Sequence, residues 1–458
     1  AAHLLAGVQT EMLDQRCLWK LYMMRHKTLH FWRIPQRFSD WDLGDDSIIW
    51  HGKGPRKESQ KYLQLKRNLL ALPAQQAGGD GVVEVMARVP ATSAKGSFRV
   101  GWKPQNDEPR VASTRIRCLN PLKALQAQGF PVELYSEKRR DEYDIVVFLK
   151  AYNENDIRLA EDLKARGKRV VFDLCDNHFL MNETRVARLR RMFQLADYWV
   201  TSTPALAEVI RENLGGMEHK PIHVIEDAVE ETLITPALNV SGKVKAHWQM
   251  AALSRFLGRQ GHEGTTHLVW FGNHQGSHRD SGLVHVQKLR PLLETLAVRH
   301  PLTLTIISNS RDSFEKHFAG WQMPLFYMDW SPHNFFQAMK RHHIAVIPIQ
   351  VNEFTKVKTN NRIALSLYLG LGVVADGIGS YEEFAGCTVL DDWDKGLETY
   401  ITRPELMAAH VSEGRRIIAE HYSLPVIARR WGDLFDAIWE GGVQQSIEEV
   451  AAGRVASR

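Results

Sequence analysis

Short apolar runs alternate with amphipathic helical stretches along most of this chain, and this alternation limits its fold more than any other feature. The pattern begins at Phe98, is interrupted once, and then continues to about residue 390. Strands buried on both faces read as continuous apolar runs, and the helices between them return the chain to the same edge of a parallel sheet. We therefore predict an α/β protein made of two doubly wound, Rossmann-like units that face a cleft.

Strands and helices can be placed in both units from this pattern. The strands expected in the first unit are Arg99–Trp102, Val132–Tyr135, Ile145–Leu149, Val170–Asp173, Trp199–Ser202 and His223–Ile225. Those expected in the second unit are Leu268–Phe271, Leu302–Ser308, Leu325–Tyr327, Ile344–Ile349, Val373–Ala375 and Thr388–Leu390. The helices expected between the strands are Val111–Gln128, Asn155–Arg166, Glu183–Leu195, Ala205–Asn213, Gly282–Val298, Asn334–His342 and Arg362–Leu369.

The same pattern gives the domain organisation. Residues 1–95 are an N-terminal extension of unknown fold, predicted to be mostly helical around Met12 to Met24. We expect the first unit at 96–235, a linker with one helix at 236–265, and the second unit at 266–410. Residues 411–458 are expected to form C-terminal helices that cross back to the first unit, followed by a tail. Two such units in series place ligands at the carboxyl ends of the strands that face the cleft.

Two cations and two amides stand at the start of one unusually apolar helix, in the segment Lys358–Arg362. Unpaired N–H groups and a partial positive charge at a helix N-terminus favour anions, and Lys358 and Arg362 would add full charges there. This segment therefore predicts a site for a phosphate-bearing ligand. The alternative is that Asn360 or Thr359 only caps the helix while both cations are solvated.

Composition is that of an ordinary globular enzyme, with 458 residues, 44% hydrophobic and 24% charged. The four cysteines lack the spacing of a zinc site or a disulfide framework, which favours a reducing compartment. No long apolar run or signal-peptide pattern is present, so we expect a cytoplasmic protein. Because the chain begins with Ala1 rather than Met, we expect a processed or excised product.

The basic excess lies in the N-terminal extension. Residues 1–70 contain 12 Lys/Arg and 7 Asp/Glu, and this difference of +5 equals the net charge of the whole chain. It is too small to indicate nucleic-acid binding. Residues 1–70 could contact an anionic surface, such as the inner face of a membrane, or could simply be solvated. The sequence does not decide between these two, and it leaves the oligomeric state open.

Several segments resemble the GT-B glycosyltransferases, in particular those of glycosyltransferase family 4, which use nucleotide-sugar donors. In the first unit the resemblance is carried by Ala112–Arg117, Ala196–Thr203 and Val224–Val229. In the second unit it is carried by Val269–Asn273, Ile347-Pro348 and Lys358–Val374. The resemblance implies transfer of a sugar from a nucleotide-diphosphate sugar to a hydroxyl of a glycan, lipid-linked or protein acceptor. It also implies a role in glycan or polysaccharide synthesis, with no cofactor beyond the nucleotide sugar.

By this resemblance the donor is held by the second unit. The residues expected to bind the donor are Gly272, Asn273, Arg279, Trp330, Lys358, Asn360, Asn361, Arg362, Glu382 and Glu383. Cations and N–H donors at the diphosphate would stabilise the departing charge, so no metal is expected. The resemblance favours a retaining mechanism, and the sequence leaves an inverting one open. Many retaining members carry two glutamates near this helix, but here those positions hold Val357 and Leu365. Glu353 could replace them, as could Glu382 and Glu383.

The acceptor and the catalytic groups are expected on the first unit. The acceptor-side loop of the family is similar to Ser113, Thr114 and Arg115 here. Asp176 and His178 follow a predicted strand, and with Lys358 they are our catalytic candidates, Asp176 or His178 taking a proton or orienting the acceptor. Their alternative role is in a turn or cap. For Trp330 the alternative to stacking on a nucleobase is a place in the core.

Two acidic segments imitate a metal-binding motif. Asp40–Asp42 and Asp392–Asp394 both read Asp-Trp-Asp, and we interpret them as acidic turns in polar loops.

Two other functions stay open beside the glycosyltransferase. One is a GT-B scaffold or binding subunit without turnover, which the missing glutamates favour, and the other is a sugar-phosphate enzyme of the same fold.

Overall fold

The computed structural model describes residues 98–217, 220–234, 239–261, 264–274 and 282–456, together with 29–31 and 50–52. In the N-terminal extension it describes only two short strands, β1 (Leu29–Phe31) and β2 (Trp50–Gly52), which pair antiparallel. The helix predicted near Met12 to Met24 and the segment Asp40–Asp42 lie outside the described residues, as does the basic excess of residues 1–70 apart from these strands.

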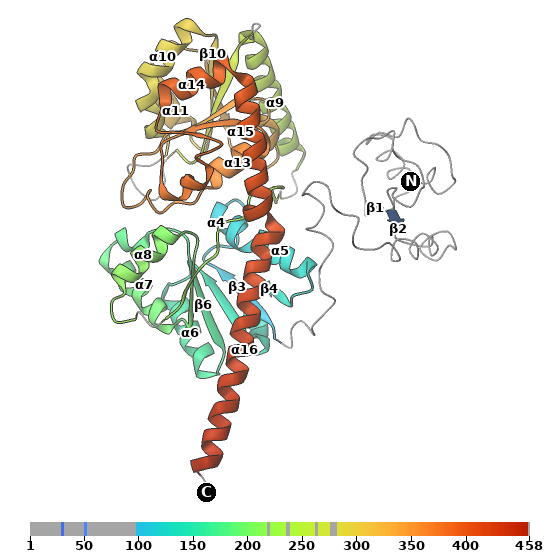
Figure 1. The fold of residues 1–458 in the computed structure, drawn as a ribbon, viewed down its shortest axis with the longest axis vertical. Helices are drawn as coiled ribbons and strands as arrows, with labels where there is room; N and C mark the ends of the chain where they lie inside the picture. The colour runs from blue at the N-terminus through green and yellow to red at the C-terminus, as the bar shows by residue number, and fades with distance from the viewer. Residues whose placement is uncertain are drawn as a thin grey trace. The chain divides into compact units, whose positions relative to one another are not determined.

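The first unit is a six-stranded parallel sheet in the order β4-β3-β5-β6-β7-β8. Its strands are β3 (Val100–Pro104), β4 (Val132–Leu134), β5 (Ile145–Leu149), β6 (Arg169–Leu174), β7 (Tyr198–Thr201) and β8 (Ile222–Val224). Its helices are α4 (Ala112–Thr114), the π-helical turn η5 (Arg115–Leu119), α5 (Asn120–Ala127), α6 (Glu154–Ala165), α7 (Glu183–Leu195) and α8 (Pro204–Asn213), with short 3₁₀ turns η6 (Glu137–Glu142) and η7 (His178–Leu180). Figure 1 shows these helices around the sheet.

The second unit repeats the plan with the strand order β11-β10-β9-β12-β13-β14, all parallel. Its strands are β9 (Thr266–Phe271), β10 (Leu302–Ser308), β11 (Leu325–Asp329), β12 (Ile344–Ile347), β13 (Gly372–Ala375) and β14 (Val389–Leu390). Its helices are α9 (Val240–Gln260), α10 (Arg290–Arg299), α11 (Arg311–Phe318), α12 (Phe335–Met339), α13 (Asn361–Leu369), α14 (Trp393–Thr402) and α15 (Pro404–Ile417), with the turns η8 (Leu283–Leu289), η9 (Gly379–Phe384) and η10 (Ile418–Tyr422).

These two sheets confirm the predicted fold class, the two-unit Rossmann-like arrangement of the GT-B fold. All the strands predicted from the sequence are present, with ends that differ by at most two residues. Two helices were not predicted, α11 and α14. The reading of Asp392–Asp394 as a loop is wrong, because Asp392 is the N-terminal cap residue of α14 and Trp393 begins that helix.

The long C-terminal helix α16 (Leu424–Ala456) lies beside α5 of the first unit (Figure 1). Its apolar side chains Trp431 and Phe435 belong to the core of the first sheet, and the Trp431 and Trp102 ring centroids are 4.7 Å apart. Contact is close at Gly432, where an added Cβ would lie 2.6 Å from the Phe130 ring. The chain therefore leaves the second unit and completes the core of the first.

A buried histidine in the second unit gives a pH-dependent stability. Burial lowers the pKa of His342 to about 3, and its ring pairs with the Ala338 carbonyl at 2.9 Å and the Thr305 hydroxyl at 2.7 Å. In the unfolded chain the His342 imidazole binds a proton below about pH 6.5, whereas in the folded chain it stays neutral until a much lower pH. We therefore expect the contribution of His342 to the free energy of unfolding to fall as pH drops from about 6.5 towards 3 and to level off below that.

The pH dependence can be measured by urea unfolding at a series of pH values, in wild type and in His342→Gln. Glutamine keeps an amide near Thr305 but does not titrate, so the slope between about pH 6 and 4 should be shallower by up to ~1.4 kcal/mol per pH unit. Equal slopes in the two proteins would show that His342 is not the group responsible.

Candidate functional site

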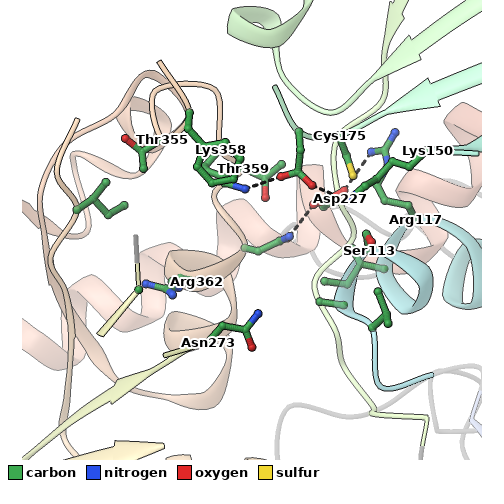
Figure 2. Close-up of a pocket in the computed structure, with 18 of the residues that line it drawn as sticks. Ser113, Arg117, Lys150, Cys175, Asp227, Asn273, Thr355, Lys358, Thr359 and Arg362 are labelled. Carbon is green, nitrogen blue, oxygen red and sulfur yellow. Dashed lines mark hydrogen bonds and ion pairs between the residues drawn. The ribbon is translucent and has the colours of Figure 1, made fainter. Parts of the chain in front are cut away.

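A cavity of about 490 Å³ lies where the carboxyl ends of the two sheets meet. In each sheet the strand order reverses at the first strand, between β3 and β5 and between β9 and β12, and such switch points are where doubly wound folds bind ligands. Residues that follow these strands line the cavity, namely Lys150 after β5, Asn273 after β9 and Ile349 after β12. The topology of both units thus places the cavity, and Figure 2 shows lining residues from each of them, among them Lys150 and Asn273.

The Arg362 guanidinium is the cation of this cavity that has no carboxylate partner among the described residues. It extends from the first turn of α13 and lies 5.3 Å from the Trp270 ring centroid and 6.0 Å from that of Phe271. Burial lowers the pKa of Arg362, opposed by Tyr381, but a guanidinium remains charged at physiological pH. An unpaired, half-buried cation at a helix N-terminus attracts an anion.

Gly272 makes room for this guanidinium. A Cβ at position 272 would lie 2.1 Å from Nη2 of Arg362, which no pair of non-bonded atoms tolerates. The backbone here has φ of 155°, a value that residues with a side chain seldom adopt. The absence of a side chain at Gly272 therefore leaves room for the Arg362 guanidinium. Asn360, the N-terminal cap residue of α13, makes no side-chain capping bond, so the alternative of a helix capped by Asn360 does not describe this end of α13.

Lys358 reaches across the cavity to the first unit. Its ammonium pairs with Oδ1 of Asp176, and Lys150 pairs with Oδ2 of the same carboxylate at 2.6 Å (Figure 2). Burial would raise the pKa of Asp176, but Lys358 and Lys150 outweigh it and hold the pKa well below the usual range. Asp176 is consequently a weak proton acceptor, better suited to position the two lysines than to act as a general base.

A buried ionic network continues from this point into the first unit. Arg117 on η5 donates to Asp173 through Nη2 at 2.6 Å and Nε at 3.1 Å, and to Asp227 through Nη1 at 3.0 Å. Burial lowers the pKa of Arg117, but the two carboxylates outweigh it and raise the pKa above its usual range. Asn361 at the start of α13 donates to the other oxygen of Asp227 at 2.6 Å. The network thus sets the start of α13 against the first unit.

Two further hydrogen bonds join the units beside the cavity. The Thr203 hydroxyl donates to the Val357 carbonyl at 3.0 Å, and the Asn177 amide donates to the Glu353 carbonyl at 3.0 Å. Both acceptors lie on the segment that leads into Lys358. Side chains of the first unit therefore hold the segment before Lys358 at two points, Glu353 and Val357.

The predicted catalytic residue His178 lies near charged groups of the cavity but is not one of its lining residues. Its side chain is buried, and Nδ1 is 2.9 Å from the Tyr152 hydroxyl. Burial, reinforced by Lys150, lowers its pKa to about 4. His178 is not among the residues that line the cavity, whereas Asp176 and Lys358 are.

Of the predicted acceptor loop, only Ser113 lines the cavity. The Thr114 hydroxyl donates to the Asn106 carbonyl at 2.6 Å. Arg115 is buried and makes a two-pronged ion pair with Glu230, at 2.8 Å through Nε and 3.0 Å through Nη2. The wide turn of η5 directs both Arg115 and Arg117 inward, and the sequence did not predict this turn.

The predicted donor residues are divided between the cavity and its surroundings. Asn273, Lys358, Asn361 and Arg362 line it, and Asn360 is buried at the start of α13. Trp330 packs 6.1 Å from Phe335, with Arg115 5.3 Å above its ring, and does not line the cavity.

The remaining donor candidates lie elsewhere. Glu382 is exposed, and Glu383 accepts a hydrogen bond from the Tyr422 hydroxyl. Arg279 lies outside the described residues. Glu353, a possible substitute for the missing glutamates, is exposed and pairs with Lys356 at 2.7 Å.

Several cavity residues were not predicted, namely Lys150, Cys175, Asp227, His285 and Tyr381. Lys150 and Asp227 follow strands of the first sheet closely, so the rule that ligands lie at strand ends could have found both. Lys150 also has φ of 53°, an uncommon backbone conformation for a side chain of this size. Burial raises the pKa of the Cys175 thiol to about 12, which keeps it protonated.

Within the described residues, no group of three or more His, Cys, Asp or Glu side chains is placed to hold a metal ion. The cavity carboxylates Asp176 and Asp227 are both engaged by cations or an amide.

No protein-family model matches the sequence, and no curated protein matches it. Among solved structures, the chain is similar to an α,α-trehalose-phosphate synthase (UDP-forming) from Burkholderia vietnamiensis, at 11% identity over 72% of this chain and 77% of the other, with a TM-score of 0.47. It is also similar to a synthase from Burkholderia xenovorans in complex with glucose-6-phosphate, at 10% identity over 68% of this chain and 75% of the other, with a TM-score of 0.44. A third similar structure is the N-terminal domain of a trehalose-6-phosphate phosphatase from Candida albicans, at 8% identity over 65% of this chain and 72% of the other, with a TM-score of 0.45. At these identities and TM-scores we infer no activity from the similarity.

Proposed function

We propose that this protein is a glycosyltransferase that moves a sugar from a nucleoside-diphosphate sugar to an acceptor hydroxyl, in glycan or polysaccharide synthesis. The observation that carries the proposal is the Arg362 guanidinium, which lines the cavity beside Gly272 and has no carboxylate partner among the described residues. A diphosphate supplies the charge and the paired oxygens that such a group binds best.

The chemistry follows from where the charges lie. When the bond between the sugar C1 and the phosphate oxygen breaks, its electron pair stays on the diphosphate, and Arg362, the start of α13 and Lys358 would stabilise the added charge. The acceptor oxygen then bonds to C1 from the side of the first unit. The weak basicity of Asp176 favours a retaining route, in which the departing phosphate oxygen takes the acceptor proton.

On this proposal the acceptor lies against Ser113, Lys150 and Asp176, the cavity residues of the first unit. Asp176 would then orient the acceptor hydroxyl as well as the two lysines. The acceptor itself, whether glycan, lipid-linked or protein, is a separate question from the donor site, and a cytoplasmic location suits all three.

A scaffold without turnover is the second candidate. It is favoured by Val357 and Leu365, which stand where many retaining members carry glutamates and which are both buried in apolar clusters. A scaffold would keep the diphosphate site and lose only the transfer, so binding and turnover must be measured separately.

A binding screen by calorimetry tests the donor assignment. We expect nucleoside diphosphates and their sugars to bind and nucleoside monophosphates to bind more weakly, because a diphosphate offers more charge and more oxygens to Arg362 and Lys358. Simple sugar phosphates should bind more weakly still, because they also lack the nucleoside. A preference for sugar phosphates over nucleoside diphosphates would favour the sugar-phosphate enzyme instead.

We predict that transfer does not depend on a divalent ion. Metal-dependent sites need free carboxylates beside the phosphates, whereas Asp176 and Asp227 are neutralised by Lys150, Lys358 and Arg117. The initial rate in excess EDTA should therefore equal the rate without it. Loss of activity in EDTA with recovery on adding manganese would contradict this assignment.

A further inference from the structure

Helix α9 presents an apolar stripe to solvent. Val240, Val244 and Trp248 stand four residues apart and are 79%, 48% and 62% exposed. Residues at this spacing lie on one face of a helix, so the three side chains form a continuous strip over its first turns. They account for three of the large apolar side chains that are exposed in the described part of the chain.

The opposite face of α9 is fixed to the second unit. Leu253 and Leu257 are buried in its core, and the Phe256 ring stacks on Phe326 of β11 at 5.1 Å. The Asn334 amide donates to the side chain of Gln249 at 3.1 Å. Because these contacts set the rotation of the helix, the stripe cannot turn inward to bury itself.

The charges of α9 are all of one sign. Residues 240–260 contain Lys243, Lys245, Arg255 and Arg259 but neither Asp nor Glu. Lys243 and Lys245 flank the apolar stripe and are both exposed. Lys245 is 3.4 Å from the Asp329 carboxylate, while no carboxylate among the described residues pairs with Lys243. An apolar strip between lysines complements a surface that has an apolar interior and an anionic outer layer.

We propose that the exposed face of α9 docks on an anionic lipid bilayer, with Val240, Val244 and Trp248 entering the headgroup region and the lysines meeting lipid phosphates. Helices with this pattern lie in the plane of the interface and bind through apolar burial together with charge attraction. A second copy of the chain is a poorer partner, because two such faces would bring like charges together. Each helix in the described part of the chain is too short or too polar to cross a bilayer.

Co-sedimentation of the full-length protein with vesicles tests the proposal. We expect binding to vesicles of phosphatidylcholine with phosphatidylglycerol, little binding to phosphatidylcholine alone, and weaker binding as salt is raised. The double variant Val244→Ser/Trp248→Ala should bind the anionic vesicles roughly tenfold or more weakly, since it removes most of the apolar strip. Val298→Ser, at an 87% exposed position on α10, is the matched control and should bind as wild type does.

Three outcomes would overturn the proposal. They are no binding of wild type to anionic vesicles, equal binding of the double variant and wild type, and light scattering that shows a dimer which the double variant loses. The last would assign the stripe to a second copy. None of these measurements depends on the glycosyltransferase proposal, because vesicle binding requires neither donor nor turnover.

Discussion

An Arg362→Ala variant is expected to bind nucleoside diphosphates about 1.5–3 kcal/mol more weakly than wild type, or roughly 10–150-fold in Kd. The reason is that Arg362 lines the cavity and has no carboxylate partner among the described residues, so no protein carboxylate competes with the ligand for its charged hydrogen bonds. Lys358→Ala should have a smaller effect, because Asp176 already pairs with Lys358 and competes with the ligand. Isothermal titration calorimetry measures both.

Three further variants make this test specific. Arg362→Lys keeps the charge but loses the two-pronged geometry, so its affinity should lie between those of wild type and Arg362→Ala. Gly272→Ala should weaken binding too, because the new methyl group would occupy the place of Nη2. Arg299→Ala, on the exposed surface of α10, should bind as wild type does. Unchanged affinity in both Arg362→Ala and Gly272→Ala would show that the diphosphate binds elsewhere.

Replacing Arg117 by Met is expected to lower the free energy of unfolding by about 3–5 kcal/mol, the cost of leaving a buried charge without its partner. Arg117 is 1% exposed, and its loss would leave the carboxylates of Asp173 and Asp227 buried and unpaired. Unfolding in urea, followed by tryptophan fluorescence, measures the change. The variant should also loosen the start of α13, because Asp227 would no longer be held for Asn361.

The control for this prediction is Arg166→Ala. Arg166 also pairs with two carboxylates, those of Asp162 and Asp141, but all three groups lie at the surface, where water screens them. Its removal should leave unfolding nearly unchanged. Equal small effects of Arg117→Met and Arg166→Ala would mean that the buried network does not stabilise the fold. An Arg117→Met protein that does not fold can be replaced by Arg117→Lys, for which an intermediate loss is expected.

The sheets could be predicted because parallel strands are buried on both faces. Runs such as Ile145–Leu149 and Ile344–Ile347 have apolar side chains on both sides, a pattern that few other structures require. The helices α11 and α14 are short, with eight and ten residues, and were missed although both are amphipathic. The interpretation of Asp392–Asp394 as an acidic turn hid the start of α14.

The site was predictable where it depends on local sequence. Lys358 and Arg362 lie at the start of an apolar helix, and the structure places both in the cavity. The roles expected for His178 and Arg115 depend on which way each side chain points, and tertiary contacts decide that. His178 pairs with Tyr152 and Arg115 with Glu230, 115 residues along the chain, and neither partner was visible as a local pattern.

The release of nucleoside diphosphate from a panel of nucleotide sugars, in excess EDTA and with a mixture of glycan acceptors, tests the central claim most directly. We predict that wild type releases diphosphate from at least one donor, that the sugar is recovered on an acceptor or as free sugar, and that Arg362→Ala loses most of this activity while remaining folded. Binding of diphosphate without release from any donor would contradict the claim and identify a scaffold, as would release that Arg362→Ala leaves unchanged.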